Sequence, residues 1–162
     1  MSPNAAESQA PSHEPLIAAL LCRVGATVCA LPLEHVAETM RPQPVESIPG
    51  VPAFVTGVAI IRGVPLPVVD LARLLELDTD VAPSRFVTVR IAERQVAIAV
   101  HEVIGVRSLD PESVAHLPPL LASANAQFLS TMGALDSRLL VLLETSKILP
   151  DFAWASATGA VA

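Results

Sequence analysis

Aromatic residues are scarce in this sequence. They make up 3% of its 162 residues, and tyrosine is absent. Because 52% of the residues are hydrophobic, the interior must be packed mainly from valine, leucine, isoleucine and alanine. A deep aromatic ligand cage is therefore not expected. The length corresponds to one domain that can bury a core without disulfide or metal support.

Positive charge and long apolar runs are also in short supply. Ten lysines and arginines against sixteen aspartates and glutamates give a formal charge of −6, so nucleic acid and anionic membrane surfaces are poor partners. The apolar run at residues 16–22 is too short for a signal peptide. Later apolar runs are interrupted well before the roughly 20 residues of a membrane-spanning helix. We therefore expect a cytoplasmic protein without direct membrane insertion.

Cysteine and the common catalytic motifs give no sign of an active site. Cys22 and Cys29 have no second pair and no nearby histidine to complete a zinc site. A tight turn at residues 25–26 would place the two cysteines opposite each other, whereas a longer turn would shift the pairing. We expect two buried, reduced thiols. Hydrolase, metalloprotease and nucleotide-binding motifs are missing, so no enzyme activity, cofactor or metal is expected.

Short β-type segments dominate what is present. They are rich in valine, isoleucine and leucine and end at glycine, proline or charged turns, a spacing typical of small barrels or a sandwich. These segments lie at 16–24, 27–33, 55–61, 66–71, 85–91, 96–100 and 139–143. Brief helical signals occur at 49–55, from Leu71, at Asp110 and from about Thr145. The sequence therefore predicts an all-β fold with short helices.

A faint internal repeat relates two halves of the chain. Residues 29–36 resemble 96–103 at an offset of 67, and residues 67–75 resemble 141–149 at an offset of 74. The seven extra residues fall in a loop-like stretch, where an insertion leaves the strands in register. Two similar halves predict two small barrels that pack together, because neither would bury much alone. Chance similarity between valine-rich segments is the alternative.

The expected domain boundaries follow from where apolar periodicity begins and ends. Residues 16–150 form the predicted folded unit, with its two barrel lobes. Residues 1–15 and 151–162 lack apolar periodicity and are predicted to be tails.

The most distinctive segment runs over residues 57–71, GVAIIRGVPLPVVDL. Two strand-like runs flank Arg62-Gly63, and Gly63 can take the positive φ that a tight reversal needs. An arginine held there beside apolar neighbours can bind a partner's carboxylate, although a solvated hairpin charge is the simpler interpretation. Pro65 and Pro67 remove two backbone donors, so the second run should lie on an edge or at a bulge.

This segment resembles the signature of the CheW-domain family, in which a Gly-Val run, an Arg-Gly turn and a Pro-Val-Val-Asp-Leu close follow in order. Other parts of the domain resemble VGATVCALPLEHVAETMR, IPGVPAFVTGV, RQVAIAVHEVIGV and FLSTMGALDSRLLVLLETSKIL. Together these stretches cover nearly all of residues 16–150.

The resemblance implies a fold of two SH3-like five-stranded β-barrels packed together. It also implies a non-enzymatic adaptor that couples the cytoplasmic tip of methyl-accepting chemoreceptors to the regulatory domain of the histidine kinase CheA. Positions that the family uses for receptor or kinase contact are occupied by Arg62, Gly63, Gly57, Val36 and Glu38. Arg62 is the strongest single candidate.

Two departures from the family pattern bear on partner choice. Ile60-Ile61 stands where the family usually has Asn-Leu before the turn, and His101 stands where an aspartate is common in the second lobe. The alternative function is therefore a divergent CheW-like adaptor of a pilus-driven surface-motility system or another chemosensory-type system, which modulates rather than completes kinase coupling.

Two further hypotheses stay open. A small β-barrel enzyme or ligand-binding module would require Asp70, His101 and Glu102 to converge in a pocket. The simpler expectation makes Asp70 a cap on backbone N–H groups and gives His101 a structural or interfacial role. The other hypothesis is a CheW-like domain that has lost kinase coupling and acts as a decoy or spacer.

Overall fold

The computed structural model describes residues 16–91, 93–110, 114–116, 129–135 and 138–143. The predicted tails at 1–15 and 151–162, and the predicted helix from Thr145, lie outside the described residues. Strands dominate the described part: β1 Ile17–Val24, β2 Thr27–Pro32, β3 Val36–Met40, β4 Val55–Ile61, β5 Val64–Asp70, β6 Arg85–Ile91, β7 Arg94–Val100, β8 Glu102–Leu109, β9 Val114–His116, β10 Leu129–Leu135 and β11 Arg138–Leu143. The short helices are the 3₁₀ helix η1, Leu33–His35, and α2, Leu71–Leu74.

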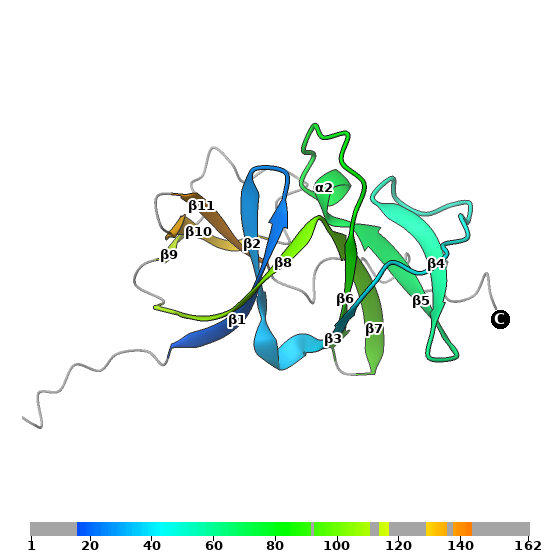
Figure 1. Cartoon of the computed structure of the whole chain (residues 1–162), viewed down its shortest axis with the longest axis horizontal. Helices are drawn as coiled ribbons and strands as arrows, with labels where there is room; N and C mark the ends of the chain where they lie inside the picture. Colours follow the sequence, from blue (N-terminus) through cyan, green and yellow to red (C-terminus); the bar gives the residue numbers. More distant parts are fainter. Residues whose placement is uncertain (1–15, 92, 111–113, 117–128, 136–137, 144–162) are drawn as a thin grey trace, which may run out of the picture.

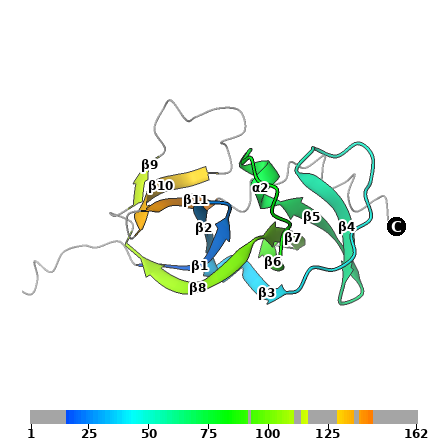
Figure 2. The same cartoon turned by 45° about the horizontal axis from the view of Figure 1, so that its top comes forward.

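The strands form two sheets that lie side by side (Figures 1 and 2). The first has the order β8-β1-β2-β11-β10-β9 and forms the lobe on the left of Figure 1, which we call lobe A. The second has the order β3-β6-β7-β5-β4 and forms the lobe on the right, lobe B. Both lobes are built from valine- and leucine-rich segments, which favour a pleated, half-buried surface.

The internal repeat is present in the strand register. The parallel pair Val68↔Ala97 in lobe B becomes Leu142↔Ala30 in lobe A when 74 is added to the first number and 67 is subtracted from the second. The β4–β5 pair Ile61↔Val64 corresponds in the same way to Leu135↔Arg138. Five strands of each lobe therefore share one plan, as the sequence similarity predicts, and lobe A has β9 as a sixth strand beyond the five predicted.

The lobes are not the two consecutive halves of the chain. β1 and β2, from the first half, belong to lobe A together with β8, β10 and β11, whereas β6 and β7, from the second half, belong to lobe B together with β3, β4 and β5. Each half thus gives its opening hairpin to the other half's lobe. The repeat alone suggested one barrel from each half, and this exchange corrects that interpretation.

Among the described side chains, three apolar clusters form the interior. The first lies between the lobes and combines side chains of both sheets, such as Leu31 and Cys29 from lobe A with Val87 and Ile98 from lobe B. Smaller clusters belong to one lobe each, one around Leu21 in lobe A and one around Phe86 in lobe B. The shared core means that each lobe supplies part of the other's apolar burial.

The opening hairpin turns tightly at residues 25–26 and places Cys22 opposite Cys29. Both thiols are buried and free, as predicted. Burial raises the pKa of Cys22 and of Cys29 to about 12, because the charged thiolate loses its hydration in the apolar core.

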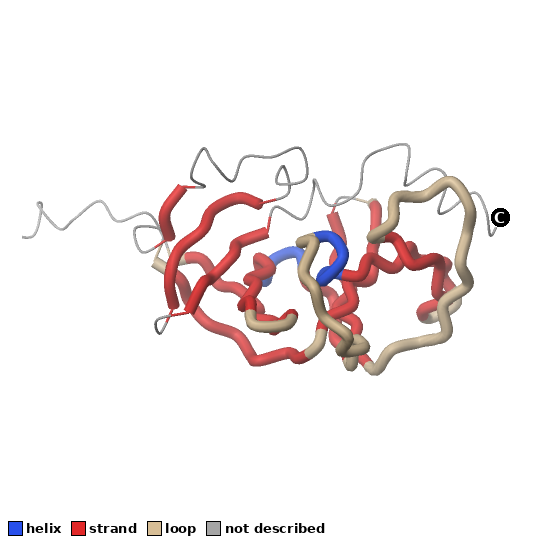
Figure 3. Tube along the Cα trace, turned by 90° about the horizontal axis from the view of Figure 1, so that it is seen from above, coloured by secondary structure: helices blue, strands red, loops and turns tan. Residues whose placement is uncertain are grey.

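The helical predictions hold only in part. α2 begins at Leu71 as predicted, and the helical segments lie near the middle of the molecule between the two groups of strands (Figure 3). Residues 49–54 form turns and bends rather than a helical turn. The helix predicted to start at Asp110 would begin in residues 111–113, which lie outside the described residues, and strand β9 follows from Val114. No helix in the described ranges is long and apolar enough to cross a membrane.

Candidate interaction site

Arg62 and Gly63 form the two-residue turn between β4 and β5. Their φ angles are 52° and 77°, the left-handed pair that matches the twist of a hairpin. The turn holds a non-glycine residue in a sparsely populated region, so it fixes where the arginine side chain begins. The proline-bearing part of β5 pairs only with β4, since β7 pairs with β5 at residues 68–70. Pro65 and Pro67 therefore lie in a part of β5 that has a neighbouring strand on one side only, as predicted.

The Arg62 side chain binds Glu38 with two parallel hydrogen bonds. Nε donates to Oε1 and a terminal nitrogen donates to Oε2, each at 2.8 Å. The hydrogen bonds from Arg62 lower the pKa of Glu38, and the carboxylate in turn raises the pKa of Arg62. The arginine side chain is 78% exposed and the glutamate 29%. The guanidinium is thus held in a fixed direction at the surface while it stays accessible.

The pair joins the two edges of the lobe B sheet. Glu38 lies on edge strand β3 and Arg62 follows edge strand β4. The backbone of Glu46 completes the closure, because it exchanges hydrogen bonds of 2.9 and 2.8 Å with Val58 on β4. The segment after β3 thus bridges to the opposite edge strand and gives lobe B a barrel shape; the ion pair lies at one end of this barrel, which we call its mouth.

Gly57 is required by this closure. A Cβ atom there would lie 2.0 Å from the backbone oxygen of Glu46, and the φ of 151° adds strain for any other residue. The structure therefore gives Gly57 an architectural role, and its predicted contact with a partner stays a prediction.

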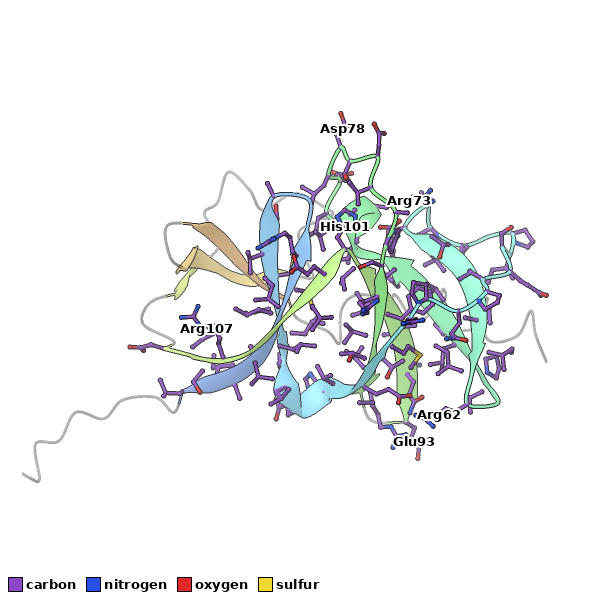
Figure 4. The ribbon with its side chains drawn as sticks, viewed as in Figure 1. Arg62, Arg73, Asp78, Glu93, His101 and Arg107 are labelled. Atoms are coloured by element: carbon purple, nitrogen blue, oxygen red, sulfur yellow. The ribbon has the colours of Figure 1, made fainter. Side chains whose placement is uncertain are left out.

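A hollow of about 300 Å³ opens beside the ion pair. It is lined by Ala37, Glu38, Ile61, Arg62, Val64, Thr88, Arg90 and Gln95. Ile61 is buried and forms part of the apolar floor, while Val64 at the rim is 48% exposed and the neighbouring Ile60 54%. Arg62 lies at the lower end of the molecule in Figure 4, away from Arg73 and His101. An apolar floor with a charged rim suits a protein segment that carries both kinds of side chain.

The structure brings together only part of the predicted site. Arg62, Gly63 and Glu38 meet at the mouth of the barrel, whereas Val36 packs against the core shared by the two lobes. Thr88, Arg90 and Gln95 were not predicted. They come from β6 and β7, which the repeat assigned to the other barrel, so the strand exchange explains why sequence reasoning missed them.

Asp70 of the enzyme hypothesis contacts α2, whereas His101 and Glu102 contact the β1–β2 hairpin. Oδ1 of Asp70 accepts hydrogen bonds from the backbone N–H groups of α2, at 3.0 Å from Ala72, which confirms the predicted cap. Nδ1 of His101 accepts from the backbone N–H of Gly25 at 2.9 Å, a structural role. Glu102 pairs with Arg23 at 2.9 Å. The hollow contains none of the three.

Metal-binding side chains are not grouped either. Among the described residues no three histidines, cysteines, aspartates or glutamates lie together as metal ligands would. The hollow at the mouth of lobe B, with its apolar lining and its exposed ion pair, is the best candidate site.

The comparisons with known proteins agree with this geometry. Residues 18–153 match the CheW-like domain family. The chain belongs to this family. The relatives and the solved neighbour are named as chemotaxis or scaffolding proteins and not as enzymes.

Individual relatives and one solved structure support the assignment. The chain is 31% identical to a chemotaxis protein CheW of Klebsiella aerogenes over 107 residues, which is 65% of this chain and 64% of that protein. It is 24% identical to a probable chemotaxis protein CheW of Rhizobium etli, over 80% of this chain and 84% of the relative. The scaffolding protein TtCheW of Thermoanaerobacter tengcongensis has the same fold, with a TM-score of 0.70 at 22% identity over 80% of this chain and 89% of TtCheW. The predicted all-β fold with two SH3-like lobes is confirmed.

Proposed function

We propose that this chain couples chemoreceptors to a CheA-type histidine kinase in a chemosensory array in the cytoplasm. It would bind the cytoplasmic tip of a methyl-accepting receptor and the regulatory domain of the kinase. The observation that carries the proposal is the exposed, doubly hydrogen-bonded Arg62–Glu38 pair at the mouth of lobe B. Arg62, Gly63 and Glu38 occupy positions that the CheW-like family uses for partner contact.

The proposed mechanism is geometric. Two lobes share one core and exchange hairpins, so the body that carries the two binding surfaces is stiff. A partner bound on one surface then biases the affinity for a partner on the other through linkage. Each contact can be modest, because the many copies in an array add avidity.

A charge reversal at Arg62 tests the proposal. Arg62→Glu places two carboxylates at the mouth and removes the directed guanidinium, so receptor-coupled activation of the kinase should fall at least tenfold. The melting temperature should stay close to that of the wild type, because exposed ion pairs contribute little to stability. The matched control is Arg73→Glu, which removes an ion pair with Asp70 at the opposite end of the molecule (Figure 4). Normal activation by a folded Arg62→Glu protein would remove Arg62 from the interface.

Binding measurements separate coupling from the decoy hypothesis. A receptor tip fragment and a purified CheA regulatory domain from the same organism should each bind the wild-type chain. Binding of the receptor alone would identify a decoy or spacer, and binding of neither would end the proposal. The relatives are named as chemotaxis proteins, which does not favour the surface-motility alternative.

A further inference from the structure

Two guanidinium groups line the hollow at the mouth of lobe B, and their surroundings differ. Arg62 is neutralised by the carboxylate of Glu38. Arg90 on β6 faces Gln95 on β7, and with the Gln95 amide oxygen turned toward it, the oxygen accepts from Nε at 2.9 Å and also from a terminal nitrogen. A neutral amide orients an arginine without cancelling its charge. The charge on Arg90 is therefore held in place and still uncompensated by this contact.

The internal repeat provides a comparison within the same molecule. The position of Arg90 in lobe B corresponds to Arg23 in lobe A at the offset of 67, since Arg90↔Gln95 matches Arg23↔Val28 in register. Arg23 is paired with the carboxylate of Glu102 at 2.9 Å. The same frame thus carries a neutralised arginine in one lobe and an arginine with a neutral partner in the other.

The net charge of the side chains that line the hollow is opposite in sign to the net charge of the whole chain. The lining holds two arginines and one glutamate, which gives +1, whereas the whole chain carries −6. The remaining lining includes Ile61 and Val64, so the positive charge stands beside apolar surface. A carboxylate that enters this hollow would meet an oriented guanidinium beside apolar side chains and could form a charge-assisted hydrogen bond with it.

We propose that Arg90 is a second anion-binding residue of the partner site, and that it receives an aspartate or glutamate of a partner protein whose neighbouring apolar side chains rest on Val64 and Ile61. This proposal rests on the adaptor function proposed above. Arg62 fixes the rim through its pair with Glu38, and Arg90 selects for an acidic partner segment. The hollow would then set which receptor or kinase sequence is accepted.

Neutralising Arg90 provides the test. The probes are the receptor tip fragment and the CheA regulatory domain, titrated by calorimetry against the wild-type chain and Arg90→Gln at low and high salt. For the probe whose binding depends on Arg62, Arg90→Gln should weaken binding about tenfold, the loss of one charge-assisted hydrogen bond. The salt dependence of binding should also become shallower, because one charge contact is gone.

Two controls separate a direct contact from a general effect of charge. Arg23→Gln removes the equivalent arginine of lobe A, and Glu93→Gln removes a negative charge near the tip of the β6–β7 hairpin, outside the lining of the hollow (Figure 4). Both variants should bind within about twofold of the wild type, since neither side chain lines the hollow. Circular dichroism confirms that each variant is folded.

The outcomes distinguish this proposal from the one on which it rests. If Arg90→Gln binds the probe as tightly as the wild type does, while Arg62→Glu binds it more weakly, Arg90 has no role in binding. The proposed adaptor function would then still stand. An equal loss in Arg23→Gln would also overturn the role of Arg90, because the effect would then come from net charge. A wild-type chain that binds neither probe would remove both proposals together.

Discussion

Lobes A and B follow one plan, yet they differ where lobe B carries its charged mouth. Glu38 on β3 corresponds by register to Gly105 on β8, and Arg90 with its neutral partner corresponds to Arg23 with its carboxylate. The apolar positions that pack the core have counterparts in both lobes, as Cys22 opposite Cys29 matches Val89 opposite Val96. The repeated positions therefore specify the frame, and the positions that break the repeat include those that we propose for recognition.

Substitutions of glycine should show the largest difference in the free energy of unfolding between the two lobes. Gly57 and Gly105 have similar φ angles, 151° and 147°, but only the added Cβ at 57 meets the backbone of Glu46. We expect Gly57→Ala to lower the free energy of unfolding by about 4 kcal/mol, from strain and a clash that must displace backbone. Gly105→Ala should cost only about 1.5 kcal/mol, from strain alone. Urea unfolding of both variants measures the difference, and equal losses would contradict the closure described for lobe B.

Leucine truncations sharpen the comparison by testing whether the lobes unfold separately. Leu31 lies in the shared core and Leu21 in the core of lobe A, and both are almost fully buried. Each change to alanine should lower the free energy of unfolding by about 3 kcal/mol. Because the hairpins are exchanged, hydrogen exchange should report one common loss of protection in peptides of both lobes. A protected lobe B in Leu21→Ala would show that the lobes are independent.

The two thiols should give a smaller, pH-dependent effect. The raised pKa values mean that the native thiols stay protonated, so alkylation at neutral pH should be slow until the protein unfolds. Their contribution to stability is full below the ordinary thiol pKa of 9.0 and is lost as the pH rises toward about 12. Cys22→Val combined with Cys29→Val, which copies lobe B, should remove this alkaline dependence in thermal melts. Rapid labelling of the native chain would show that the hairpin opens.

The smallest effect on stability is expected at the mouth of lobe B. The pKa of Glu38 is lowered by its hydrogen bonds with Arg62, so the stabilisation is present above the ordinary value of 4.5 and is lost as the pH falls below it. The wild type should melt slightly higher than Glu38→Gln at neutral pH, and the difference should vanish in acid. If the difference in melting temperature persists at about pH 2, the ion pair between Glu38 and Arg62 is not its source.

Much of the frame was predictable because apolar period and turn chemistry act locally. The tight turns at Gly25 and Arg62-Gly63, the cap at Asp70 and the buried cysteines all follow from short-range signals. The apolar pattern missed β3, β8, β9 and β10, of which all but β10 are edge strands. Edge strands carry charges and glycine, as Glu38 and Gly105 do here, and so give a weak strand signal.

The candidate site was predictable only on its hairpin side. Arg62 and Gly63 stand in a local motif, and Glu38 followed from the family resemblance. Arg90 and Gln95 lie on a hairpin that the sequence order placed in the other half of the molecule. No local pattern records which sheet a hairpin joins, because that choice depends on pairing between distant strands.

The exchanged hairpins impose an order on synthesis. Cys29 on β2 pairs with Val141 on β11, which is synthesised 112 residues later, so this pairing cannot form before then. Until then the first hairpin has no parallel neighbour, and its apolar face is available to chaperones or to other nascent chains. Pairing over such a distance also slows folding. A nascent chain that lacks its last strands should therefore be the most aggregation-prone species that this gene produces.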